Sequence, residues 1–121
     1  MIKLMFCLRR RPEMSREEFQ RYWRETHAPL VAERAQTLRI KKYVQLHSSD
    51  EEQNAAIRSS RGGPAQYDGV AELWWESWDD LAAAVATPEG QQAGADLLED
   101  ERRFIDLGDS PLWFGEEHQI V

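Results

Sequence analysis

The chain has 121 residues, enough for one hydrophobic core and too few for two full domains. Twenty-two acidic against fifteen basic side chains give a formal charge of −7, and no run of Lys or Arg offsets it. This charge repels phosphate groups and argues against nucleic acid or an anionic membrane as a partner. Five tryptophans are more than so small a core needs, which indicates a partner or ligand to contact.

Features that the sequence lacks argue against several other classes of protein. The longest apolar run near the start, residues 4–8, is too short for a signal-peptide core or a membrane span. The single cysteine, Cys7, cannot form an internal disulfide, which fits a reducing cytoplasm. The three histidines lack zinc-ligand spacing, and no Gly-rich phosphate loop is present. We therefore expect a cytoplasmic protein with no metal or cofactor.

The first predicted elements are a strand and a helix. Apolar residues alternate from Ile2 to Arg9, as in a strand with one buried face. Ser15 and Glu18 form a capping box that starts a helix. An apolar stripe follows at three- and four-residue steps, with His27 at its edge: Phe19, Tyr22, Trp23, Thr26 and Leu30. Pro29 removes a backbone amide and predicts a kink or restart there.

The middle of the chain contains two more strands around a polar segment. Residues 40–47 predict a strand with Ile40, Val44 and Leu46 on one face and Tyr43, Gln45 and His47 on the other. Residues 48–66 are polar and aperiodic, so we expect a long loop that is a functional lid or disordered. Residues 69–75 predict the third strand, apolar on both faces apart from Glu72.

Two helices and a strand complete the chain. Ser77 is the expected cap of one helix, and Thr87 with Pro88 starts another, which Gly108 and Pro111 end. Residues 112–114 predict a short last strand. The order strand, helix, strand, strand, helix, strand favours a single α+β domain over residues 1–121 with the ferredoxin-like βαββαβ topology. Its four-stranded antiparallel sheet has the first and third strands in the centre and helices on one face.

The other sheet face carries a mixed set of side chains. If the purely apolar parity faces the helices, the open face holds Lys3, Met5, Cys7, Arg9, Tyr43, Gln45, His47, Val70, Glu72 and Trp74. Contiguous apolar surface of this kind marks an interface or a ligand site. We expect a second copy's sheet to cover it, with a largely apolar pocket between the two sheets.

Several segments resemble the EthD domain family. The most specific is Tyr22-Trp23-Arg24-Glu25-Thr26-His27-Ala28-Pro29-Leu30, and residues 2–4, 9–12, 15–19, 67–74, 100–101 and 104–106 add weaker matches. The resemblance covers nearly the whole chain except residues 48–66. It implies a dimeric α+β barrel in which two ferredoxin-like sheets face each other. Related barrels include polyketide cyclases, cofactor-free monooxygenases and muconolactone isomerases.

Two residues are the candidate catalytic groups. His27 titrates near neutrality and could transfer a proton, or it is a structural histidine bonded to a carbonyl that Pro29 leaves free. Glu72 is either a buried carboxylate with a raised pKa or the ion-pair partner of Lys3 or Arg9, from where it could still orient a ligand. In the predicted chemistry, Glu72 is the partner of His27 or a carboxylate that orients the ligand.

Four further residues are candidate ligand contacts. Tyr43 and His47 lie on the same face of one strand. They either contact the same ligand or extend into solvent from an edge strand. Trp74 would stack on a planar ligand or fill the dimer seam, and Arg9 lies on the same predicted face.

The predicted function follows from the mixed open face and the His27 motif. We expect a homodimer that binds a small hydrophobic molecule, aromatic or polyketide-like, between its sheets. It would assist cofactor-independent proton transfer (cyclisation, dehydration or isomerisation) or oxidation of that molecule. The alternative is a non-enzymatic dimeric accessory or carrier protein of an oxidative, monooxygenase pathway.

Overall fold

A four-stranded antiparallel sheet organises the protein. The computed structural model describes residues 1–121. Its strands are β1 (Ile2–Leu8), β2 (Lys42–His47), β3 (Gly69–Trp75) and β4 (Leu112–Glu116), in the spatial order β2-β3-β1-β4. All three strand pairs are antiparallel, with β1 and β3 in the centre. The predicted ferredoxin-like topology is confirmed.

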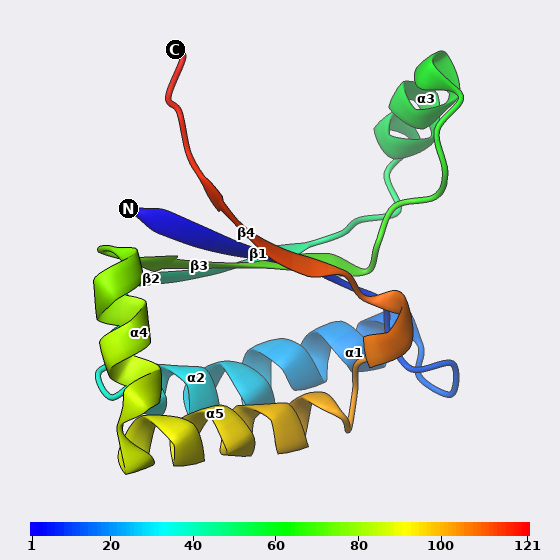
Figure 1. Ribbon diagram of the computed structural model, residues 1–121. Coiled ribbons are helices and arrows are strands. Elements are labelled where there is room, and N and C mark those ends of the chain that lie inside the picture. The colour runs from blue at the N-terminus through cyan, green and yellow to red at the C-terminus, as the bar shows by residue number, and fades with distance from the viewer.

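Helices cover one face of this sheet. They are α1 (Arg16–Tyr22), a π-helical turn (Trp23–His27), α2 (Ala28–Arg34), α4 (Trp78–Ala86) and α5 (Pro88–Glu101). Figure 1 shows α1, α2 and α5 lying across the same face, with α4 standing at one end of the layer. We call this the helix face of the sheet and the opposite one the open face. None of the helices combines the length and apolar content that crossing a membrane requires.

The predicted helix starts are observed. The Ser15 hydroxyl accepts from the Glu18 amide while the Glu18 carboxylate accepts from the Ser15 amide, so the capping box is complete. Ser77 accepts from the amide of Asp80, and Thr87 from that of Gly90. These caps are local interactions between near neighbours, which is why spacing alone predicts them.

The restart expected near Pro29 is a π-helical turn. Proline has no amide proton to donate, and the helix widens over Trp23–His27 so that the Ala28 amide donates to the Trp23 carbonyl, five residues back. Both end residues of this turn are buried, Trp23 at 1 % and His27 at 5 % exposure. Widened turns often occur at functional sites, and this one contains the main catalytic candidate.

The segment 48–66 is not a structureless loop, which corrects the prediction. Residues Glu52–Arg61 form α3, which ends at Gly62 in the left-handed conformation. None of its residues is buried, and Figure 1 shows it projecting from the open-face side of the sheet. A helix with no face packed on the core needs no apolar period, so periodicity could not predict it.

The facing of β2 is opposite to the prediction. Tyr43 pairs with Leu73 and Gln45 with Ala71, and residues directly paired across a sheet share one face. Tyr43, Gln45 and His47 therefore belong to the helix face, and Val44 and Leu46 to the open face. The strand begins only at Lys42, so Ile40 lies outside its alternation. A one-residue error in parity moves every side chain of a strand to the other face.

Candidate functional site

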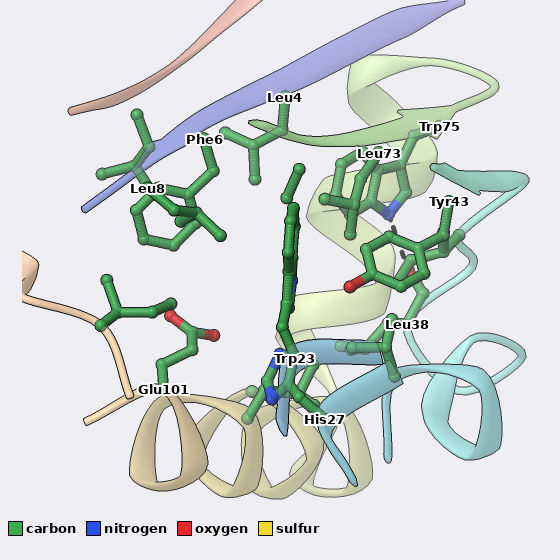
Figure 2. A pocket seen from close by; sticks show the side chains of 17 residues that line it. Leu4, Phe6, Leu8, Trp23, His27, Leu38, Tyr43, Leu73, Trp75 and Glu101 are labelled. Carbon is green, nitrogen blue, oxygen red and sulfur yellow. Dashed lines mark hydrogen bonds between the residues drawn. The ribbon is translucent and has the colours of Figure 1, made fainter. Parts of the chain in front are cut away.

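An apolar cavity lies between the helix face of the sheet and the helices. Its volume is about 200 Å³, and Figure 2 shows side chains from the sheet and from the helices packed against it converging on the cavity. The lining residues are Leu4, Phe6, Leu8, Trp23, His27, Val31, Leu38, Ile40, Tyr43, Ala71, Leu73, Trp75, Gly94, Leu97, Glu101, Ile105 and Leu112. Because a cavity of about 150 Å³ holds benzene, this one admits a single ring with a small substituent.

His27 brings a nitrogen base to the cavity wall. Its Nδ1 lies 2.8 Å from Oδ2 of Asp100, which is 2 % exposed. Burial lowers the pKa of His27 by more than the Asp100 carboxylate raises it, which favours the neutral imidazole. A carboxylate only accepts hydrogen bonds, so the proton of the neutral ring is on Nδ1. Nε2 makes no hydrogen bond within the chain, and its lone pair is available to a ligand.

Asp100 holds that imidazole in place through a small polar network. The same carboxylate accepts from the Tyr22 hydroxyl at 2.6 Å and from the Arg103 guanidinium at 3.0 Å. Burial acts to raise the pKa of Asp100, but the hydrogen bonds from Tyr22, His27 and Arg103 outweigh it and lower that pKa. Asp100 is therefore ionised and fixes both the tautomer and the orientation of His27.

Glu101, the next residue on α5, faces the cavity itself. Figure 2 shows its carboxyl group directed inward on the side of the cavity where His27 lies. Burial, reinforced by the neighbouring charge of Asp100, raises the pKa of Glu101 to about 7. Its carboxyl group makes no hydrogen bond within the chain. Near neutral pH the cavity thus contains a carboxyl group that both gives and takes protons readily.

Asp100 and Glu101 were not among the predicted site residues, although a pattern in the sequence marks one of them. Glu101 falls on the apolar stripe of α5, four residues after Leu97 and three before Phe104. An acidic residue at such a position faces the interior. Asp100 lies in one of the segments that resemble the EthD family, but no spacing in the sequence identifies it as the partner of His27, which is 73 residues away.

Tyr43 lines the cavity, whereas His47 does not. His47 is connected to Tyr43 by hydrogen bonds through the Gln45 side chain. Nε2 of Gln45 donates to the Tyr43 hydroxyl oxygen at 2.8 Å and to the Trp23 carbonyl at 3.0 Å. Nε2 of His47 lies 2.8 Å from Oε1 of Gln45, and its ring stacks on Trp23 with centroids 4.5 Å apart. Burial raises the pKa of Tyr43, although the side-chain donors of Gln45 and Trp23 act to lower that pKa.

The other predicted site residues do not line the cavity. Glu72 lies on the open face, 2.8 Å from the Lys3 ammonium, which confirms the expected ion pair with Lys3. Glu72 is not the partner of His27, because Asp100 takes that position. The reason is the strand parity: Leu73 lines the cavity, so Glu72 points the opposite way.

Trp74 and Arg9 are occupied by contacts within the chain. The ammonium groups of Lys3 and Lys42 lie 4.5 and 4.7 Å from the Trp74 ring centroid, and the indole donates to Glu117. Trp74 is consequently buried without any ligand or partner. Arg9 stacks on Tyr67, 4.2 Å from that ring centroid. No group of three His, Cys, Asp or Glu side chains is placed to hold a metal ion.

The family is decided by a match over most of the chain. The family model of the EthD domain matches residues 11–108. The chain belongs to the EthD domain family. His27, Tyr43 and Glu101, which line the cavity, and Asp100, which holds His27, all fall inside the EthD segment. No curated protein matches the chain.

Solved structures confirm the fold of this EthD domain. An EthD family protein from Bacillus halodurans is 22 % identical, with a TM-score of 0.63 over 98 % of this chain and 99 % of that one. A dimeric protein of unknown function and ferredoxin-like fold from Bacteroides fragilis is 13 % identical, with a TM-score of 0.58 over 96 % and 95 %. SnoaB, a cofactor-independent oxygenase from Streptomyces nogalater, is 16 % identical, with a TM-score of 0.52 over 99 % and 93 %.

Proposed function

We propose that this EthD protein is a homodimer in which each chain binds a small hydrophobic molecule in its cavity and catalyses a cofactor-independent proton transfer on it. The observation that carries the proposal is a histidine, His27, held by Asp100 in the wall of a largely apolar cavity that also contains the Glu101 carboxyl group. The cavity volume favours one aromatic ring or an alicyclic group of similar size. The reaction class is isomerisation, dehydration or cyclisation, each of which begins with removal of a proton.

The chemistry assigns different roles to the three ionisable groups. Nε2 of His27 removes a proton from a C–H or O–H group of the ligand, and the Asp100 carboxylate stabilises the imidazolium that forms. Glu101, with its pKa about 7, returns a proton to a second atom of the ligand. The apolar surroundings strengthen both interactions because little water competes with them.

The homodimer is supported by the open face of the sheet. Leu46 is 59 % exposed there, and Trp113, which pairs with Met5 on the same face, is 51 % exposed. These two side chains lie on the two edge strands of the open face, and apolar side chains left exposed on a sheet face are typical of an interface. The dimeric Bacteroides fragilis neighbour has the same fold.

Proton abstraction is testable before the natural substrate is identified. Acetophenone fits the expected size and carries exchangeable methyl hydrogens, whose replacement in D₂O is followed by proton NMR. We expect the wild-type protein to accelerate the exchange. Removal of a general base costs about 10²- to 10⁴-fold, so His27→Gln should reduce the acceleration by that factor and Asp100→Asn should reduce it too. Glu72→Gln is the matched control and should keep the wild-type rate.

The outcomes separate the candidate functions. Undiminished exchange by a folded His27→Gln protein, checked by circular dichroism, would contradict the assignment of the base. Binding of acetophenone with no acceleration in the wild type would favour the carrier or accessory role instead.

A further inference from the structure

We infer that Tyr43 is a fixed hydrogen-bond donor to the cavity, and that the bound molecule therefore carries an acceptor oxygen of the carbonyl or enolate type. The inference rests on the proposed function, because it assumes that the cavity binds a ligand. It follows from a series of hydrogen bonds along β2 in which only one assignment of donors and acceptors is possible.

The series of hydrogen bonds starts at a backbone carbonyl. The Trp23 oxygen is an acceptor only, and the Gln45 side-chain amide approaches it at 3.0 Å. The amide group on that side must therefore be NH₂ and not the carbonyl oxygen. A flipped amide would place two acceptor oxygens against each other in a partly buried site.

The same NH₂ group determines the role of the Tyr43 hydroxyl. Its nitrogen lies 2.8 Å from the phenol oxygen, so that oxygen accepts and its own proton points elsewhere. No group in the chain accepts that proton. Tyr43 lines the cavity, and Figure 2 shows its oxygen directed into the interior. The free O–H bond is therefore available to a ligand.

His47 secures the other end of the amide. Oε1 of Gln45 can only accept, so the His47 Nε2 at 2.8 Å carries a proton and donates it. The His47 ring is itself held by its stacking on Trp23. His47 and Gln45 are positioning residues that act through Tyr43, which explains why two polar side chains occupy the helix face of an edge strand.

The cavity thus offers one acceptor, His27 Nε2, and one donor, the Tyr43 hydroxyl. A small ketone with a hydrogen on the adjacent carbon satisfies both groups. As His27 removes that hydrogen, negative charge develops on the ketone oxygen, where a preorganised donor has its largest effect. We therefore assign the ligand to small cyclic or aryl ketones and their enols.

A matched pair of probes tests this donor. Acetophenone and α-methylstyrene have nearly the same shape, but only the ketone accepts a hydrogen bond. Calorimetry should show that the ratio of their dissociation constants shifts against the ketone by about three- to tenfold in Tyr43→Phe, the value of one hydrogen bond. Tyr67→Phe removes a phenol outside the cavity and should leave the ratio unchanged.

The positioning role has its own spectroscopic readout. The carbonyl carbon of ¹³C-labelled acetophenone should resonate downfield when bound to the wild type and lose that shift in Tyr43→Phe. Gln45→Glu places an acceptor beside the phenol, so the Tyr43 proton should turn to it and the shift should disappear. If Gln45→Glu kept the full downfield shift, Gln45 would not control the hydroxyl.

The experiments distinguish failure of the Tyr43 donor role from failure of the proposed function. An unchanged probe ratio in Tyr43→Phe, with both molecules bound, would overturn the donor role and leave the proposed function standing. Binding of neither probe to the wild type would overturn both.

Discussion

At the scale of single residues, Asp100 and Glu101 show how position alone moves the pKa values of two neighbouring carboxyl groups in opposite directions. Asp100 receives hydrogen bonds from Tyr22, His27 and Arg103, which lower its pKa despite its burial. Glu101 receives none and faces an apolar cavity, so its pKa rises to about 7. A pair of titratable groups with pKa values moved apart is what acid–base chemistry near neutral pH needs.

The raised pKa of Glu101 predicts a pH-dependent stability. Its folded-state pKa exceeds the unfolded value of 4.5, so the folded state favours the protonated form, and stability falls as the pH rises from about 5 through 7. The loss for one partly buried group is on the order of 2 kcal/mol. Glu101→Gln, which cannot ionise, should lack this loss when free energies of unfolding are measured by urea denaturation at pH 5 and pH 8. The same pH dependence in the variant and the wild type would contradict the assignment.

At the scale of elements, the π-helical turn and β3 are fitted to each other. Trp23, the first residue of the turn, packs against Gly69, the first residue of β3, which leaves room for its indole. A Cβ at position 69 would lie 2.4 Å from the Trp23 ring and 2.8 Å from the Leu46 carbonyl oxygen. Glycine is needed there for a close approach, and the approach positions the tryptophan that separates His47 from the cavity.

Gly69→Ala should therefore destabilise the protein. Overpacking of this kind costs about 1–3 kcal/mol, because either the indole or the strand must shift. Gly115→Ala in β4 is the control, since a Cβ there meets nothing within 4 Å. Chemical denaturation of both variants measures the difference. Equal stabilities would show that the contact at Gly69 relaxes without cost.

At the scale of the whole molecule, the two faces of the sheet have separate tasks. The helix face encloses the cavity within one chain, and the open face carries exposed apolar side chains. Lys3, Glu72 and Trp74 form a compact polar and aromatic cluster in its middle. Figure 1 shows α3 and the C-terminal segment projecting on this same side, opposite the cavity, so α3 is not placed as a lid over it.

The proposed dimer predicts a selective effect of charge on the open face. Leu46→Glu places a carboxylate at the interface and should shift the protein toward monomer in sedimentation analysis. Val85 on α4 is 49 % exposed, close to the 59 % of Leu46, but lies outside this face. Val85→Glu should leave the assembly intact. A wild-type monomer at micromolar concentration would contradict the dimer.

The sequence by itself determined the order of the four strands and of the helices that cover the sheet, the caps of three helices, the facing of β1 and β3, and the family. Each depends on short spacings, and the family motif around His27 is itself a contiguous run of residues. Only the tertiary structure decided the facing of β2, the partner of His27 and the position of the cavity inside one chain. The parity of an edge strand depends on its register with β3, and the His27–Asp100 pair on packing between segments 73 residues apart. Such long-range contacts leave no periodic trace in the sequence, because nothing local requires an aspartate at position 100 or a tyrosine facing inward at position 43.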